Sequence, residues 1–281
     1  MQLTEQQIKK FQKKIYDYYN TFGRTFSWRK TTNPYQIFIS EVMLQQTQTV
    51  RVERPYQLFI KRFPDFKSVA KASLYEILEA WQGLGYNRRA KFLHQAANIL
   101  LKLYKGKVPN DTKILETLPG IGKATAASIA AFAFNSPTVF VETNIRVVFI
   151  HLFLAHKENI SDTELLFLSE QTLDRSAPRI WYYALTDYGA MLKSQGINPI
   201  NKSKTYNKQS KFEGSDRQMR GAIIRHLLHH KTQNLKQICH LLEKSLTAKP
   251  ERTKKIVDAL VKEGFVEQKK EGKNSFYCLK S

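Results

Sequence analysis

The chain has 281 residues, a net charge of +21 at pH 7 and a hydrophobic content of 42%. This apolar content argues against a disordered polybasic chain, and no stretch approaches the roughly 18 to 20 apolar residues that span a membrane. The two cysteines are too few for a disulfide framework or a four-cysteine metal site, and no secretory signal is expected at the N-terminus. We therefore expect a cytoplasmic protein of about two domains.

The positive charge is spread along the sequence. Residues 1–193 carry 26 basic and 16 acidic side chains, and residues 194–281 carry 19 and 8. An excess of this size favours a polyanion as the partner, and nucleic acid is the simplest choice. A basic protein without a nucleic-acid role remains the alternative at this point.

Residues 1–193 predict an almost entirely helical domain, because apolar residues recur at spacings of three and four. Within it, Glu41 is expected on a helix whose one face also carries Phe38, Gln45 and Gln48. A carboxyl beside apolar groups has a raised pKa and can act as an acid near neutrality, and the amides suit the edges of bases. Periodicity alone favours the alternative, a surface glutamate with incidental glutamines.

The next candidate site is the turn that contains Gly83 and Gly85, followed by Tyr86, Arg88 and Arg89. An aromatic ring at a loop tip can wedge between bases while neighbouring cations hold phosphates. The alternative is that Tyr86 is a core residue.

Residues 118–129 then read Leu-Pro-Gly-Ile-Gly-Lys-Ala-Thr-Ala-Ala-Ser-Ile, a glycine turn that opens a helix of small residues. This is a helix-hairpin-helix pattern, which binds a DNA phosphate through backbone N–H groups without reading bases. Gly120, Gly122, Lys123 and Thr125 are the candidate DNA contacts, and an ordinary tight turn is the alternative.

Glu142 is predicted near the start of a further helix, where the helix dipole stabilises a carboxylate. Cleavage at an anomeric carbon uses two carboxyl groups in opposite states, one protonated to assist the leaving group and one ionised to stabilise the sugar cation. Glu41 and Glu142 fit these two roles, although Glu142 on its own also fits a plain helix cap.

Residues 194–281 differ in composition and pattern from the helical part before them. Residues 194–214 are polar and basic and predict a linker, and residues 215–281 predict three helices followed by a hairpin, the order of a winged helix. The basic side chains that we expect to meet DNA lie in the third helix and the hairpin, together with one threonine: Thr253, Lys254, Lys255, Lys269, Lys270 and Lys273. A winged helix used for protein contacts is the alternative.

Taken together and in this order, several motifs resemble the helix-hairpin-helix base-excision DNA glycosylases, and most closely the adenine DNA glycosylases of the MutY type. The resemblance covers roughly residues 5–193. It rests on Pro34-Tyr35, Ser40-Glu41-Val42-Met43-Leu44-Gln45-Gln46-Thr47-Gln48, Gly83-Leu84-Gly85-Tyr86, Leu118-Pro119-Gly120-Ile121-Gly122 and Asp187-Tyr188-Gly189-Ala190-Met191.

The resemblance implies roles for individual residues. Glu41 matches the acid that protonates adenine N7, and Glu142 stands where the family has the aspartate that stabilises the sugar cation. Asn144 matches an asparagine of the active-site loop. The amides of Gln45 and Gln48 match substrate-facing groups, and Tyr86 matches the tyrosine that intercalates beside the flipped base.

The chain also departs from the family. Glu142 is one methylene longer than the family aspartate. Ala124 stands where bifunctional relatives place a Schiff-base lysine, which implies a monofunctional enzyme. Lys193 stands where the first cysteine of an iron–sulfur cluster is placed, so no cofactor is expected. A winged helix takes the place of the domain that helps the family recognise 8-oxoguanine.

We therefore expect an all-α helix-hairpin-helix glycosylase domain followed by a small winged-helix (α+β) domain. The expected reaction is hydrolysis of the N-glycosidic bond of adenine mispaired with 8-oxoguanine or guanine, by a monomer acting on double-stranded DNA. Two alternatives stay open: a glycosylase of the same fold for thymine or uracil opposite guanine, and a non-catalytic DNA-binding protein. Thymine-mismatch relatives carry basic residues where Gln45 and Gln46 stand, which favours adenine.

Overall fold

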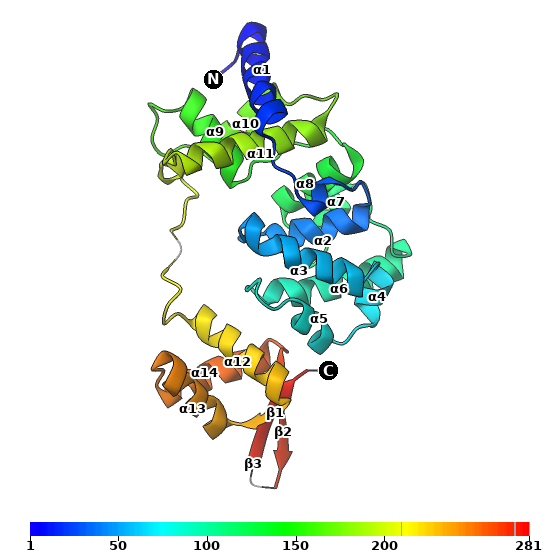
Figure 1. Ribbon diagram of the computed structural model, residues 1–281, viewed down its shortest axis with the longest axis vertical. Coiled ribbons are helices and arrows are strands. Elements are labelled where there is room, and N and C mark those ends of the chain that lie inside the picture. The colour runs from blue at the N-terminus through cyan, green and yellow to red at the C-terminus, as the bar shows by residue number, and fades with distance from the viewer. Residues whose placement is uncertain (209, 273, 281) are drawn as a thin grey trace. The chain divides into compact units, whose positions relative to one another are not determined.

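The computed structural model describes residues 1–208, 210–272 and 274–280. It divides into two compact units. Unit 1 comprises Met1–Val42 and Val108–Lys208, and unit 2 comprises Met43–Lys107 and Gln209–Ser281. The colour ramp of Figure 1 follows these segments along the chain.

Unit 1 is helical. Its elements are α1 (Glu5–Phe22), η1 (Ser27–Arg29), α2 (Pro34–Leu44, which runs across the boundary between the units), α7 (Thr112–Glu116), α8 (Lys123–Phe134), α9 (Thr143–Phe153), α10 (Asp162–Thr172), α11 (Pro178–Ser194) and η2 (Pro199–Lys202). Helix α11 packs along α9 and α1 (Figure 1). In this core the rings of Phe11 and Trp181 pack edge to face, with 5.6 Å between the ring centroids, and both side chains are buried.

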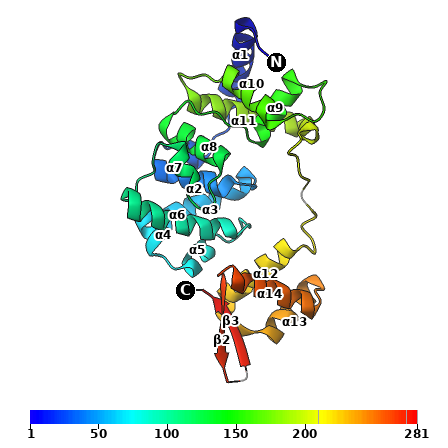
Figure 2. The ribbon, with the colours of Figure 1, turned by 180° about the vertical axis from the view of Figure 1, so that it is seen from behind.

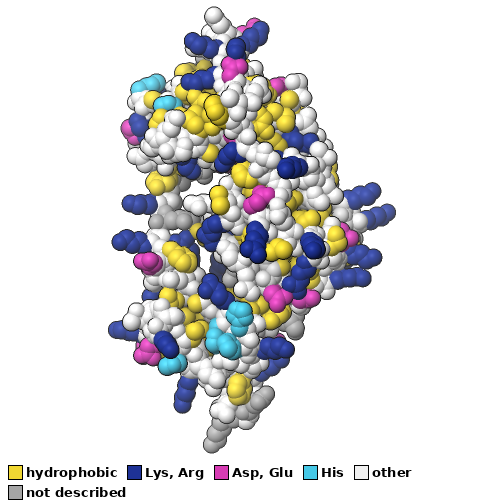
Figure 3. Space-filling model, in the orientation of Figure 1, with side chains coloured by type: hydrophobic (Ala, Val, Ile, Leu, Met, Phe, Trp, Pro, Cys, Tyr) yellow, Lys and Arg dark blue, Asp and Glu magenta, His cyan; other side chains and the backbone are white. Residues whose placement is uncertain are grey.

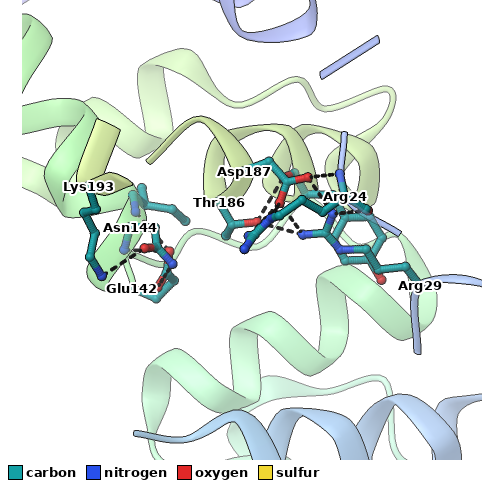
Figure 4. Close-up of polar contacts among 9 residues, drawn as sticks. Arg24, Arg29, Glu142, Asn144, Thr186, Asp187 and Lys193 are labelled. Atoms are coloured by element: carbon teal, nitrogen blue, oxygen red, sulfur yellow. Dashed lines mark hydrogen bonds and ion pairs between the residues drawn. The ribbon is translucent and has the colours of Figure 1, made fainter. Parts of the chain in front are cut away.

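A buried carboxylate ties the N-terminal segment to α11. Asp187 on α11 is 1% exposed and accepts two hydrogen bonds of 2.8 Å from the Arg29 guanidinium. The Arg24 backbone N–H and side-chain Nε donate to the same carboxylate at 2.7 Å each (Figure 4). Paired, bidentate contacts of this kind satisfy a buried charge that would otherwise be costly.

Part of the segment predicted as a linker, residues 194–214, packs on unit 1. The Arg146 guanidinium donates to Ser203 Oγ at 3.1 Å, and the Lys204 N–H donates to the Ile160 carbonyl at 2.9 Å. Ile197 and Ile200 pack, partly buried, against the hydrophobic core of unit 1, and this apolar contact keeps this part of the segment on unit 1.

Unit 2 contains further helices and a small sheet. Its elements are α3 (Thr49–Arg62), α4 (Phe66–Lys71), α5 (Leu74–Ala80), α6 (Arg88–Tyr104), α12 (Asp216–His230), β1 (Thr232–Asn234), α13 (Leu235–Leu246), α14 (Pro250–Lys262), β2 (Val266–Glu271) and β3 (Asn274–Leu279). Strands β2 and β3 form an antiparallel hairpin (Figure 2), and β1 pairs with the other edge of β3.

The predicted combination of a large helical part with a small α+β part is confirmed. Helix α12 begins after Ser215, whose hydroxyl accepts from the Gln218 N–H, and α14 begins at Pro250. Strand β1 was not predicted, because three residues are too few to show an alternating pattern. Among the helices described, none is both long and apolar enough to cross a membrane.

Candidate active site

Glu41 is a partly buried carboxyl group in the second half of α2, within unit 1. The Ser128 hydroxyl on α8 lies 2.5 Å from Glu41 Oε2 and donates a hydrogen bond to it. Burial raises the pKa of Glu41 to about 7, with the Ser128 hydrogen bond opposing the shift and the negative charge of Glu142 adding to it. A carboxyl group with such a pKa is half protonated near neutral pH and can donate a proton.

Ser128 is a site residue that the sequence did not reveal. It is 5% exposed and stands among alanines on the buried face of α8. A hydroxyl among the small apolar residues of α8, which also contains Thr125, is the signal that could have found it, but its partner lies 87 positions earlier in the chain. That separation cannot be recovered from local periodicity.

Glu142 caps the N-terminus of α9. Its Oε1 accepts from the backbone N–H groups of Asn144 at 2.8 Å and of Ile145 at 3.0 Å, and its Oε2 accepts from Asn144 Nδ2 at 3.2 Å. Figure 4 shows Glu142 and Asn144 side by side at this helix start. The predicted location at a helix N-terminus is therefore correct.

More than the predicted helix dipole sets the electrostatic balance at Glu142. Burial is the largest effect and raises the pKa of Glu142 above its ordinary value. The hydrogen bonds from Asn144 and Ile145 and the charge of Lys193 act in the opposite direction. Loss of hydration thus outweighs the helix end, and Glu142 depends on its polar neighbours to stay ionised.

The two carboxyl groups lie within electrostatic reach of each other in unit 1, since the charge of Glu142 raises the pKa of Glu41. A charged neighbour therefore helps to keep Glu41 protonated. This is the division of states, one acid and one anion, that cleavage at an anomeric carbon uses.

The helix-hairpin-helix turn joins α7 to α8 in the same unit. Gly120 has φ +78°, which a residue with a side chain rarely adopts, and Ile121 is buried beneath the turn. Gly122 is the N-cap of α8, and Gly120, Gly122 and Lys123 are exposed, whereas Thr125 is partly buried. The predicted phosphate contacts therefore stand at an accessible helix start, where backbone N–H groups and the Lys123 ammonium favour an anion.

The predicted continuous helix through Gln48 is wrong. Helix α2 ends at Leu44, Gln45 lies in a turn, and Gln48 is the N-cap of α3. Gln46 adopts φ +53° in this turn, so the backbone leaves the helical conformation there. Gln45 and Gln48 consequently belong to a loop and do not continue the helical face that carries Glu41.

Arg89 is a structural residue rather than an exposed phosphate contact. It is 7% exposed and donates to the carbonyl oxygens of Met43 at 2.7 Å and Gln45 at 2.6 Å. It also donates to Thr47 Oγ1 at 2.9 Å and to the Gly85 carbonyl at 3.2 Å. Within unit 2, the Arg89 guanidinium thus fastens the glutamine turn to the loop that ends at Tyr86.

Tyr86 and Arg88 are accessible in unit 2, and each contacts another side chain of that unit. Tyr86 is partly exposed with φ +48°, and its hydroxyl accepts from Arg217 at 2.7 Å. Arg88 is exposed and forms an ion pair of 2.8 Å with Glu263. Tyr86 is therefore not a core residue, and Arg88 must exchange a carboxylate for a phosphate if it is to contact DNA.

The lysines predicted to bind DNA in residues 215–281 are exposed where the structure describes them. Lys254 and Lys255 on α14 and Lys269 and Lys270 on β2 all have exposed side chains, while Lys273 lies outside the described residues. Thr253 is fully buried and donates to the Lys249 carbonyl, so its predicted contact with DNA is wrong. Figure 3 shows lysine and arginine side chains scattered over the visible face.

Neutralising Lys254, Lys255 and Lys270 together by alanine substitution is expected to weaken DNA binding and to flatten its salt dependence. Each lost phosphate contact lowers the slope of log K against log salt by about 0.9. Titrations of a labelled duplex at several salt concentrations measure this slope. Alanine at Lys9, Lys10 and Lys13, which are exposed on α1, is the matched control. An unchanged slope in the first variant would show that these three lysines do not contact phosphates.

The residues present do not fit an iron–sulfur cluster. The sequence contains two cysteines, and such a cluster takes four ligands. Cys278 is buried and contacts Glu267, and burial raises the pKa of the Cys239 thiol. Throughout residues 1–208, 210–272 and 274–280, no group of three or more His, Cys, Asp or Glu side chains is arranged to hold a metal ion.

Comparisons with known proteins agree with this geometry. Residues 39–175 match the HhH-GPD superfamily of base excision DNA repair proteins. An adenine DNA glycosylase of Mycolicibacterium smegmatis is 31% identical, with 92% of this chain and 93% of that protein aligned. An adenine DNA glycosylase of Buchnera aphidicola is 37% identical over 65% of this chain, which spans 52% of that protein.

A solved structure of a thermostable thymine-DNA glycosylase is also similar. It is 29% identical, with a TM-score of 0.59, and the alignment covers 66% of this chain and 86% of that chain. The glycine turn before α8, the carboxyl pair and these relationships lead to one assignment. The chain belongs to the HhH-GPD superfamily of base excision DNA repair proteins and is a DNA glycosylase.

Proposed function

We propose that this glycosylase releases adenine from DNA in which adenine is mispaired with 8-oxoguanine or guanine. The observation that carries the proposal is the Glu41 carboxyl group, which has a pKa of about 7 and stands under the influence of the Glu142 charge. The adenine glycosylases of two bacteria that align with this chain support the choice of base.

In the proposed reaction, the adenine is rotated out of the duplex, because its N-glycosidic bond is inaccessible while the base is stacked. Glu41 gives its proton to the departing base, which takes the electron pair of the breaking bond. Glu142 stabilises the positive charge that develops on the sugar. Water then supplies the hydroxyl group at the sugar carbon, and its released proton restores the acid. Ala124 offers no amine for a Schiff base, so the reaction ends at base release.

The other site residues have supporting roles in this proposal. Lys123 and the N–H groups at the start of α8 hold a phosphate, and Tyr86 occupies space beside the flipped base. Asn144 orients Glu142 through its 3.2 Å hydrogen bond. The exposed lysines of α14 and β2 add contacts to the phosphate backbone. Each of these contacts needs only one copy of the chain, so we expect a monomer.

Release of thymine opposite guanine is the second candidate, because a thymine-DNA glycosylase has a similar structure at 29% identity. Gln45 and Gln46 oppose it, since the resemblance implies basic residues at these positions in thymine-mismatch enzymes.

Base release from a panel of duplexes decides between the candidates. We expect single-turnover release of adenine from A:8-oxoguanine and A:G duplexes, and little release from T:G or U:G. The opposite order would overturn the proposal in favour of the second candidate. Binding without release from any duplex would indicate a non-catalytic DNA-binding protein.

A further inference from the structure

Lys193 reaches the Glu142 site from the last turn of α11. Its Nζ donates to Asn144 Oδ1 at 3.4 Å, and Asn144 Nδ2 donates to Glu142 Oε2 at 3.2 Å. The close-up in Figure 4 shows these three side chains connected in a row. The resemblance implies the first cysteine of an iron–sulfur cluster at this position, and this chain has a cation there.

Close helix packing brings Lys193 to this place. Gly189 lies one turn earlier on the same face of α11, against the start of α9. A Cβ at Gly189 would lie 2.2 Å from the Asn144 carbonyl oxygen, so only glycine allows this approach. The absence of that one side chain lets the α11 backbone run beside Asn144, and Lys193 follows four residues later.

The chemistry of the three groups fixes the orientation of the middle one. A lysine ammonium can only donate hydrogen bonds, and an ionised carboxylate can only accept them. The Asn144 amide stands between the two, and it therefore must turn its oxygen to Lys193 and its NH₂ group to Glu142. A reversed amide would place donor against donor at Lys193 and acceptor against acceptor at Glu142.

We infer that Lys193 is a positioning residue that fixes the Asn144 amide and keeps Glu142 charged for the reaction. The inference rests on the proposed function, in which Glu142 must be an anion when the sugar cation forms. Burial works against that charge, and the field of Lys193 works for it. The cation contributes through Asn144 and does not touch the substrate.

Lys193→Met keeps most of the length of the side chain and removes its charge. Ionisation of Glu142 should then require a higher pH, so the acid side of the pH–rate profile moves upward. A displacement of half to one pH unit corresponds to a rate about three- to tenfold lower on that side. The charged groups that bear on the site are Lys193, Glu41 and, through Glu41, Arg29. The last two are unchanged in this variant.

Two further variants separate charge from other effects. Lys193→Arg retains a cation and should restore the rate and the acid side of the profile to within about twofold of the wild type. Lys13→Met removes a lysine of α1 that pairs with Asp17 at the surface. This variant should leave the rate and the acid side of the profile unchanged. A structural defect would not be rescued by arginine.

A second readout does not depend on turnover. The glutamate carboxyl groups of the DNA-free protein are labelled with ¹³C and titrated by NMR, and the Glu142→Gln variant assigns the Glu142 signal. The experiment gives the pH at the midpoint of the Glu142 titration. We expect a higher midpoint in Lys193→Met than in the wild type. A wild type that releases no base would overturn the proposed function, and the NMR midpoint would still decide the role of Lys193.

The inference is overturned if neither the profile nor the NMR midpoint moves in Lys193→Met. It is also overturned if Lys193→Arg is as impaired as Lys193→Met. Weaker DNA binding with an unchanged midpoint would assign Lys193 to a phosphate contact instead.

Discussion

Replacing Glu41 with glutamine is expected to lower the single-turnover rate of adenine release by about 10²–10⁴-fold, the usual contribution of a general acid. Glutamine has nearly the same shape and can still accept the Ser128 hydrogen bond, but it has no proton to give to the leaving base. DNA binding should therefore remain close to that of the wild type. Rapid-quench assays on an A:8-oxoguanine duplex measure the rate, and gel-shift titrations measure the binding.

The matched control is Glu5→Gln on α1, which removes a surface carboxylate that pairs with Lys9. It should release adenine at the wild-type rate. A Glu41→Gln enzyme that also works at the wild-type rate would remove Glu41 from the role of the acid.

Replacing Glu142 with glutamine is expected to cost about 10²–10³-fold in the same rate, which is typical for the loss of one preorganised electrostatic group. Glutamine can keep an oxygen toward the N–H groups of Asn144 and Ile145 and so preserve the helix cap. Its NH₂ group, however, would then face Asn144 Nδ2, and the negative charge near the sugar would be gone.

Glu142→Asp keeps the negative charge at this residue and shortens the side chain. Aspartate caps helices well and restores the carboxylate that the resemblance places here, so substantial activity should remain. Thermal unfolding of both variants checks that the cap survives. Full activity in Glu142→Gln, or loss of activity in Glu142→Asp with a stable fold, would exclude Glu142 as the anion.

Much of the fold was predictable because its signals are local. Ser215 and Pro250 mark helix starts through side-chain and ring geometry that depends only on nearby residues. The glycine turn before α8 could likewise be predicted from its local sequence. Strand β1 was missed because it exists through pairing with β3, more than forty residues away, as in Thr232 opposite Cys278. The packed part of residues 194–214 was missed because two isoleucines form no periodic pattern.

The site was predictable to the extent that its residues belong to motifs. Glu41 and Glu142 follow from such patterns, and both lie in unit 1. Ser128 and Lys193 do not, because their partners lie 87 and 49 positions away. Arg89 was wrongly expected at a phosphate, since sequence alone cannot distinguish an exposed arginine from one that holds two loops together. The end of α2 before Gln45 depends on that same arginine.

The most direct test of the division of roles is the pH dependence of the residual rates in the two glutamine variants. In the wild type, the rate should fall above about pH 7 as Glu41 loses its proton, and it should fall at low pH as Glu142 gains one. The residual rate of Glu41→Gln should lose the fall at high pH, and that of Glu142→Gln should lose the fall at low pH. Profiles that keep both limbs in both variants would contradict the assignment of acid and anion to these two residues.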